Sequence, residues 1–255
     1  MNYFDFQESA RRYHLGRPYY QEITIQHIQD FLLIKKKLGR VLDTGSGTGL
    51  SSKALLKLSD EVYSSDISPW MQSYAPEKKK IHYSINPAES QPYPDGYFDL
   101  ITVGSAVHWF NIDAFLQEAH RLLKKDGFLI LYENNFPGEM ETNEDFHTWY
   151  QESYLKQYPP PPRNKDYPWN TENLKNKGFH WKGQEEFPNT ISFSLEQLVL
   201  YLTTHSNIIN LVENQLKDYE SIEWELNQSI QPYFLDPQNS EAFIFRNKIR
   251  YIQKI

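Results

Sequence analysis

Hydrophobic residues along the first half of the chain recur at two different spacings. Helical spacing of Ile28, Phe31, Leu32 and Leu38 predicts a helix that ends at Gly39. A second helix is predicted over residues 50–58. Short apolar runs predict strands that begin at Val41 and then cover residues 61–65, 81–85, 98–103 and 128–132.

The clearest helical pattern lies between the last two of these strands. Its apolar stripe comprises Ile112, Phe115, Leu116, Ala119, Leu122 and Leu123. Asn111 is the predicted N-cap and Gly127 the predicted C-cap. The alternation of strands and helices through residue 134 predicts an α/β fold with a doubly wound parallel sheet. Ligands bind such sheets in a crevice at the carboxyl ends of the strands.

The pattern changes after Glu133. Residues 148–158 read as an aromatic helix, residues 159–162 are four prolines that must be extended, and Tyr167, Pro168 and Trp169 continue the connection. Apolar residues then recur at steps of three and four from Ile208 to Ile230, which predicts one long helix, before residues 242–255 return to strand-like composition. We expect a single domain over residues 1–255, with a core over about 20–136 and a helical cap from 1–19 and 137–235.

The segment from Val41 to Gly49 carries the strongest chemical signal. It reads Val-Leu-Asp-Thr-Gly-Ser-Gly-Thr-Gly, with Asp43 at the end of a strand and a helix directly after the last glycine. A dinucleotide fingerprint requires glycine where this chain has Leu50, and a phosphate loop requires lysine there. Asp66 ends the next strand, where a carboxylate can accept hydrogen bonds from both hydroxyls of a ribose.

These residues resemble the motifs of class I S-adenosylmethionine-dependent methyltransferases. The first motif matches residues 41–49, and the second matches residues 66–71 in the pattern DxSxxM. Further matches follow in order at Ala88-Glu89, over residues 94–101 and over residues 121–128. The resemblance implies a Rossmann-like sheet of seven strands with an antiparallel last strand, completed by residues 191–193 and 243–250.

The resemblance also implies S-adenosylmethionine as cofactor and a set of residues that bind it. They are Tyr13, Arg17, Asp43, Gly45, Ser46, Gly47, Gly49, Asp66, Ile67, Met71, Ala88, Glu89, Gly104 and Ser105. Glycine amides suit the carboxylate of the cofactor, acids near Asp43 suit its ammonium, and Ile67 with Met71 can enclose the purine. No metal is required.

Each of these assignments has a structural alternative. The glycine turn can be a simple strand-to-helix corner, Asp66 a helix cap, and Asp43 a cap of the turn. Glu89 can be a solvated loop acid, with Ala88 contributing its backbone amide instead. Many family members have an acid at the position of Pro87, so the contact to the adenine amino group is open in this chain.

Three residues are candidates for binding or activating the methyl acceptor. Residues 106–110, the N-terminal Tyr13 with Arg17-Pro18-Tyr19, and residues 201–206 look like the branch that includes trans-aconitate methyltransferases. His108 can act as a general base or pack beside Trp109, which is itself a substrate candidate. Arg17 can clamp a carboxylate with two parallel donors or form a surface ion pair.

Composition narrows the class of partner. The chain has 26 basic and 33 acidic residues, so its net charge of −7 argues against chain-wide attraction to nucleic acid or to an anionic membrane. It has no cysteine, which removes disulfides, thiolate nucleophiles and iron–sulfur ligation. No apolar run is long enough to cross a bilayer, and no leader is evident in the first twenty residues. We expect a soluble cytoplasmic protein that acts on a small molecule, with oligomeric state open.

Other functions remain as alternatives. A catalytically silent module would bind S-adenosylmethionine without turnover, and a macromolecule methyltransferase would bind RNA or protein in a salt-sensitive manner. A nicotinamide dehydrogenase would bind NAD, against which Leu50 argues.

Overall fold

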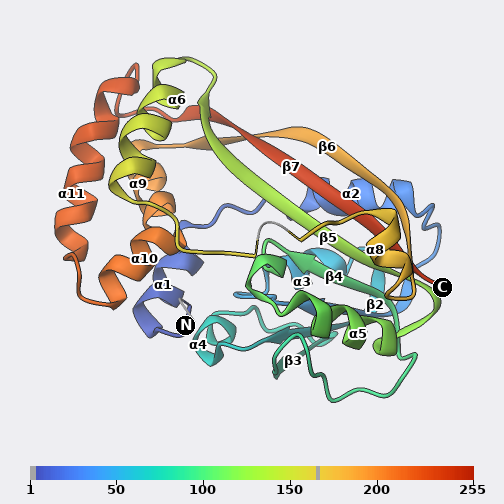
Figure 1. The fold of residues 1–255 in the computed structure, drawn as a ribbon. Helices are drawn as coiled ribbons and strands as arrows, with labels where there is room; N and C mark the ends of the chain where they lie inside the picture. The colour runs from blue at the N-terminus through green and yellow to red at the C-terminus, as the bar shows by residue number, and fades with distance from the viewer. Residues whose placement is uncertain (1–3, 165–166) are drawn as a thin grey trace. The chain divides into compact units, whose positions relative to one another are not determined.

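The computed structural model describes residues 4–164 and 167–255, in which helices and strands alternate through most of the chain (Figure 1). The strands are β1 (Leu38–Thr44), β2 (Ser59–Asp66), β3 (Ile81–Ile85), β4 (Phe98–Gly104), β5 (Leu123–Met140), β6 (Phe179–Phe193) and β7 (Glu241–Lys254). The α-helices are α1 (Gln7–Gly16), α2 (Gln21–Phe31), α3 (Leu50–Leu55), α4 (Pro69–Ser73), α5 (Ile112–Leu122), α6 (Asp145–Trp149), α7 (Leu155–Gln157), α8 (Thr171–Lys175), α9 (Leu195–Thr203), α10 (Ser206–Glu213) and α11 (Tyr219–Ile230). Shorter turns are the 3₁₀ segments η1 (Val107–Trp109) and η3 (Gln231–Tyr233) and the π-helical η2 (Tyr150–Tyr154).

The strands form one seven-stranded sheet in the order β3-β2-β1-β4-β5-β7-β6. β1 pairs in parallel with β2 and β4, β2 with β3, and β4 with β5. The last strand is antiparallel, and the fold is Rossmann-like. The fold predicted from the sequence is therefore confirmed, down to the number of strands.

The chain divides into two compact units. The sheet unit comprises residues 21–134, 163–187 and 247–255, and the helical unit comprises residues 1–20, 135–162 and 188–246. The segment 137–235, expected in the cap, is divided between the two units, because residues 163–187 group with the sheet unit. Residues 1–3 and 165–166 of the expected cap lie outside the described residues. That the helical unit covers the cofactor site stays a prediction.

The sheet unit buries apolar residues on both faces of its central strands. Leu42 of β1 and Ile101 of β4 join a cluster with the apolar stripe of α5. Their neighbours Val41 and Leu100 join a second cluster with residues of α2 and α3. Because successive side chains of a strand point to opposite faces, helices on both sides are needed to bury these strands. This layering leaves the carboxyl ends of the strands for a ligand.

One helix end in this unit differs from the prediction. The helix expected to reach Gly39 ends at Phe31, and Leu38 already belongs to β1. The physical reason lies at Leu33, whose backbone has φ +52°, while the amide of Ile34 donates to Gln29 O at 3.0 Å. A residue in this left-handed conformation ends a helix, although Leu rarely adopts it. The helix expected over residues 50–58 also stops early, at Leu55.

The junction of α5 and β5 also corrects a prediction. Asn111 is the N-cap as expected, because its side chain accepts a hydrogen bond from the amide of Ala114 at 3.3 Å. Gly127 is not the C-cap: the helix ends at Leu122, and the extended backbone of Leu123 begins β5 at once. β5 then runs far beyond the predicted residues 128–132, because polar residues that interrupt the apolar run still pair in the sheet.

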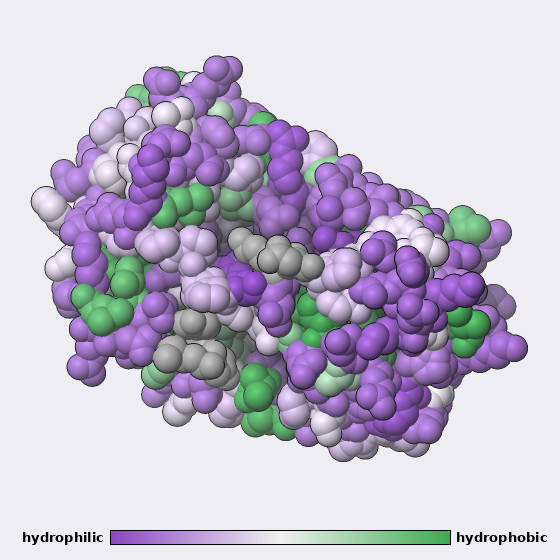
Figure 2. Space-filling model, viewed as in Figure 1, coloured by the Kyte–Doolittle hydropathy of each residue, from purple (hydrophilic) through white to green (hydrophobic). Residues whose placement is uncertain are grey.

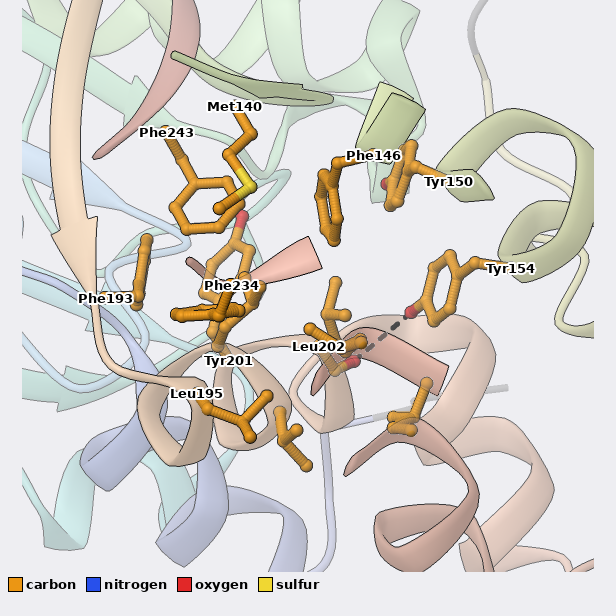
Figure 3. Packing of buried hydrophobic residues seen from close by; sticks show 14 of the residues in the cluster. Met140, Phe146, Tyr150, Tyr154, Phe193, Leu195, Tyr201, Leu202, Phe234 and Phe243 are labelled. Carbon is orange, nitrogen blue, oxygen red and sulfur yellow. Dashed lines mark hydrogen bonds between the residues drawn. The ribbon is translucent and has the colours of Figure 1, made fainter. Parts of the chain in front are cut away.

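Aromatic side chains fill the core of the helical unit. Figure 3 shows Phe146, Tyr150 and Tyr154 on one side of this core and Phe193, Tyr201, Phe234 and Phe243 on the other. The rings of Tyr150 and Tyr154 stack with centroids 5.1 Å apart, and they mark the two ends of η2. The predicted aromatic helix over residues 148–158 is present, but it is divided into α6, the π-helical turn and α7.

Two further predictions in this part of the chain were wrong in extent. The long helix expected from Ile208 to Ile230 is two helices, α10 and α11, separated by a turn with Gln215 at φ +55°. Asp218 starts the second helix as its N-cap, accepting from the amide of Ser221 at 3.0 Å. Only residues 191–193, at the end of β6, were predicted as a strand, whereas β6 covers Phe179–Phe193. Most of its residues are half-buried or exposed, so it shows no apolar run.

The face drawn in Figure 2 is covered mostly by hydrophilic residues, with hydrophobic ones in small separate groups. Large apolar side chains that are exposed include Ile67, Trp70 and Ile85. In the described part of the chain, no helix is both long enough and apolar enough to cross a bilayer.

Candidate cofactor-binding site

The turn between β1 and α3 has the backbone conformation that its glycines predict. Gly45, Gly47 and Gly49 have φ values of +67°, +55° and +73°. A Cβ atom on Gly45 would lie 2.6 Å from the Cβ of Ala106 and 3.1 Å from the ring of Phe110. Side chains at this position are therefore excluded both by backbone strain and by space. The turn is therefore restricted to glycine at this position, at the carboxyl end of β1.

Asp43 is the buried polar centre beneath this turn. Its Oδ2 accepts hydrogen bonds from the hydroxyls of Ser51 and Ser52, both at 2.6 Å, and its Oδ1 accepts from Thr102 Oγ1 at 2.9 Å. Burial raises the pKa of the Asp43 carboxyl above its ordinary value. The side chain thus ties β1 to α3 and β4, which agrees with the alternative that Asp43 holds the turn. Its direct contact with a cofactor ammonium stays a prediction.

Serine hydroxyls connect the turn to β2, and two of these serines, Ser52 and Ser64, were not predicted from the sequence. Ser64 Oγ lies 2.8 Å from Ser52 Oγ and donates to Ser46 Oγ at 2.9 Å. The amide of Ser46 donates to the carbonyl of Ser65 at 3.1 Å. The adjacent serines near the end of β2, Ser64 and Ser65, were the available signal, because a buried Ser needs a hydrogen-bonding partner.

Asp66 lies where the second motif predicts it, at the end of β2 beside the glycine turn. Its Oδ2 accepts from the amide of Gly47 at 2.8 Å, and its Oδ1 accepts from the amide of Ser68 at 2.9 Å. Ser68 in turn caps α4 by accepting from the amide of Met71 at 3.2 Å. Asp66 is half-buried, and its position beside the half-buried backbone of Gly47 fits recognition of vicinal hydroxyls.

The residues expected around the purine divide into exposed and buried ones. Ile67 is 56% exposed, whereas Met71 is 4% exposed, with its Cε 3.2 Å from where a Cβ on Gly47 would lie. Ala88 is buried. Glu89 accepts a hydrogen bond through Oε1 from the amide of Asn111 at 2.7 Å. The carboxylate of Glu89 therefore supports the start of α5, so the solvated-loop alternative does not describe it, and its contact with the cofactor stays a prediction.

The segment after β4 holds the remaining predicted residues of the sheet unit. A Cβ on Gly104 would lie 2.6 Å from the hydroxyl of Tyr132, and Ser105 has a left-handed backbone with φ +54°. His108 follows in η1, with its ring centroid 4.8 Å from that of Trp109. Arg163 stacks over the Trp109 ring at 5.2 Å, and the amide of Asn164 donates to the carbonyl of His108 at 3.0 Å.

Tyr13 and Arg17 belong to the helical unit. The Arg17 guanidinium lies 4.6 Å from the ring centroid of Tyr13 and 5.0 Å from that of Tyr201, and it donates to Thr204 O at 3.1 Å. Its Nε is buried and has no hydrogen-bonding partner among the described residues. No described acid lies within ion-pair distance of Arg17, so the surface ion pair that we had considered is not present in the described part. Its role towards a ligand stays a prediction.

Together, the residues of the sheet unit are suited to a nucleoside ligand. They combine a turn of three left-handed glycines, of which Gly45 and Gly47 are half-buried, with a half-buried carboxylate and an exposed apolar side chain at Ile67. Backbone amides and a carboxylate match the carboxyl and ribose groups of S-adenosylmethionine, and apolar side chains match its purine. The residues present therefore fit the cofactor that the motifs imply.

Comparison with known proteins agrees with this geometry. Residues 42–131 match the family model of a methyltransferase domain. A candidate methyltransferase of Dictyostelium discoideum is 32% identical over 127 residues, which are 50% of this chain and 48% of that protein. The chain therefore matches about half the length of this curated relative.

Two solved structures share the fold over nearly the whole chain. A candidate type II methyltransferase from Anaeromyxobacter dehalogenans has a TM-score of 0.73 at 18% identity, covering 92% of this chain and 97% of that one. Phosphoethanolamine N-methyltransferase 2 of Haemonchus contortus, solved with phosphomonomethylethanolamine and S-adenosylhomocysteine, has a TM-score of 0.54 at 16% identity, covering 99% and 59%. The domain match and the relatives support a class I S-adenosylmethionine-dependent methyltransferase. They do not identify the trans-aconitate branch, which stays a prediction.

Proposed function

We propose that this protein is an S-adenosylmethionine-dependent methyltransferase that acts on a small molecule. The observation that carries the proposal is the hydrogen bond from the Gly47 amide to Asp66, because it joins the glycine turn and the ribose-binding acid into one site. Either motif alone has a structural explanation. Their contact at 2.8 Å joins the carboxyl ends of β1 and β2, next to the switch point between β1 and β4, where doubly wound sheets bind nucleosides.

In this proposal the sheet unit holds the cofactor by groups already in place. Asp66 accepts hydrogen bonds from the ribose, the turn from Gly45 to Gly49 receives the methionine part, and Ile67 covers one face of the purine. When bound, S-adenosylmethionine supplies an electrophilic methyl group on a sulfonium. The contribution of the protein is alignment and exclusion of water, for which effective molarities of ~10⁵ M or more are attainable.

For the acceptor we propose a molecule with a carboxylate or a hydroxyl group, as in the branch that includes trans-aconitate methyltransferases. Support for a carboxylate comes from Arg17, whose guanidinium lacks an acidic partner among the described residues although its Nε is buried. An unpaired buried cation is costly, and an acceptor carboxylate would offset that cost. A hydroxyl acceptor would instead need a base, and His108 is the candidate.

The remaining parts of the proposal concern the size of the methyl acceptor and the cellular location of the protein. The net charge of −7 favours a small acceptor over RNA, and the Haemonchus enzyme of the same fold was solved with a small phosphorylated amine. We also propose a cytoplasmic protein in which the helical unit serves as the cap. The chief competing function is a module that binds S-adenosylmethionine without transferring its methyl group.

Two measurements test the proposal in sequence. Calorimetric titration with S-adenosylhomocysteine should show saturable binding, and absence of any binding heat or thermal shift would overturn the proposal. A mass-spectrometric screen of carboxylate and phenol metabolites with S-adenosylmethionine should then find an acceptor that gains one methyl group. Binding without turnover on any acceptor class would favour the silent module.

A further inference from the structure

The loop between β3 and β4 contains a buried glutamine that no sequence motif singled out. Gln91 is 6% exposed, and its Nε2 donates to Ser65 Oγ at 3.0 Å and to Pro87 O at 2.8 Å. Ser65 Oγ donates in turn to Asn86 O at 3.2 Å. One side chain thus fastens residues 86 and 87 to Ser65, which directly precedes Asp66 in β2.

Helix α5 holds the main chain of the same residue. Glu118 accepts from the amide of Gln91 at 2.8 Å, and Arg121 donates to its carbonyl at 3.2 Å. Arg121 is itself fixed by two hydrogen bonds to Glu118, at 2.7 and 2.8 Å. The backbone of Gln91 is therefore anchored independently of its side chain. The amides of Asn86 and Ser90 donate to Asp66 O and Pro87 O, both at 3.1 Å, so that removing the Gln91 amide group loosens Pro87 and Ala88 without displacing the whole loop.

The nitrogen and the oxygen of the Gln91 side-chain amide differ in their hydrogen bonding. Both known partners use Nε2, whereas Oε1 is buried and has no partner in the described part of the chain. A buried carbonyl oxygen without a donor destabilises the folded state, and an apolar side chain would avoid this cost. Glutamine, unlike an apolar side chain, provides the two Nε2 hydrogen bonds that hold residues 86 and 87.

We propose that Gln91 is a positioning residue for recognition of the purine base, a role that rests on the proposed function. The amide of Asn86 donates to the carbonyl of Asp66 at 3.1 Å, so this loop lies beside the ribose-binding acid, and the main chain of Ala88, which follows, is the part of the loop that would meet the base. Gln91 holds that backbone against the end of β2. It does not touch the base, because its unpartnered oxygen is buried.

The effect of Gln91 is confined to the base by the way the neighbouring groups are held. Asp66, which serves the ribose, is fixed by the amides of Gly47 and Ser68 and makes no contact with Gln91 in the hydrogen bonds described. The amide of Asn86 still donates to the carbonyl of Asp66 at 3.1 Å, so losing the Gln91 amide loosens Pro87 and Ala88 and leaves the Asp66 carboxylate in place. Ligands with and without a base should respond differently.

The test compares S-adenosylhomocysteine with S-ribosylhomocysteine, which lacks the base, by calorimetry. Gln91→Met keeps the length of the side chain and removes its donors, and Gln117→Met on the exposed face of α5 is the control. We expect Gln91→Met to bind S-adenosylhomocysteine ~10-fold more weakly, the loss expected for an ordinary hydrogen bond, with S-ribosylhomocysteine within about twofold. Hydrogen exchange at residues 86–89 should be faster in the unliganded variant, and Ser65→Ala should act in the same direction.

The outcomes separate this inference from the proposed function. If the unmodified protein binds no S-adenosylhomocysteine, the proposed function fails. If it binds and Gln91→Met binds equally well, or if exchange at residues 86–89 is unchanged, the role of Gln91 is wrong. Equal loss for both ligands with an unchanged melting temperature would also overturn it, because the effect would then not be specific to the base.

Discussion

The two units of the chain are specified by opposite kinds of interaction. In the sheet unit, the end of the sheet that carries the motifs is organised by Asp43, Asp66 and a chain of serine hydroxyls. In the helical unit, the core consists largely of packed aromatic rings, among them Phe146 and Phe243 with centroids 5.2 Å apart. Hydrogen bonds fix direction, whereas ring packing supplies buried area. We therefore expect substitutions in the first unit to act on binding and those in the second on stability.

The largest effect is expected from Phe146→Ala in the helical unit. Phe146 is fully buried and packs near Trp149, Tyr233 and Phe243. Removing its ring should lower the free energy of unfolding by about 3–5 kcal/mol, measured by urea denaturation. Trp224→Ala, on a side chain that is 66% exposed, should change it by no more than about 0.5 kcal/mol. Similar values for the two would contradict the view that ring packing stabilises this unit.

In the sheet unit, Asp66→Ala should act mainly on binding. The carboxylate serves the ribose and also holds the Gly47 amide, so its loss should weaken S-adenosylhomocysteine binding ~100-fold, or about 3 kcal/mol, by calorimetry. Asp60→Ala, at the exposed opposite end of the same strand, is the control and should leave affinity unchanged. Affinity that survives Asp66→Ala would remove the ribose assignment.

Alanine substitutions at two glycines distinguish the cost of backbone strain from the cost of close packing. Gly45 and Gly96 have nearly the same φ, +67° and +63°, but a Cβ on Gly45 meets Ala106 at 2.6 Å and one on Gly96 has nothing within 4 Å. Gly96→Ala should lower the free energy of unfolding by about 1 kcal/mol from strain alone. Gly45→Ala should cost about 1–3 kcal/mol more, because of overpacking. Equal losses in urea denaturation would show that the contact with Ala106 relaxes freely.

The smallest expected effect is the contribution of Asp43 to the pH dependence of the free energy of unfolding. Burial raises its pKa in the folded protein, so the folded state holds the proton more tightly than the unfolded one. The stability that this group contributes is present below the unfolded pKa of about 3.9 and is lost as pH rises through the folded value. The free energy of unfolding of the unmodified protein, minus that of Asp43→Asn, should therefore fall as pH is raised from about 4 to 7. A constant difference would contradict the raised pKa.

The comparison also explains what the sequence could and could not predict. The glycine turn and Asp66 were found because their chemistry is local: the positive φ values and the strand end are written into adjacent residues. Gln91 and Ser64 were missed, because a buried polar residue becomes meaningful only when its partner from another element is known. Element extents failed where tertiary pairing overrides local pattern, as in β6, whose polar residues hide a strand of 15 residues. The break between α10 and α11 near Gln215 was not predicted for the opposite reason. There a regular apolar spacing continues across a turn, so the sequence pattern indicates one helix.

The π-helical turn from Tyr150 to Tyr154 has a consequence for variation in length. A π turn contains one residue more than an α-helical turn, so deleting a single residue there would restore ordinary helix and rotate everything on one side by about 100°. Phe146 and Trp149 would then leave the ring cluster that they share with Tyr233. The extra residue of this turn thus sets the rotation of the helix that precedes it relative to the helix that follows. We therefore expect natural variants to substitute side chains in this segment far more readily than to insert or delete residues.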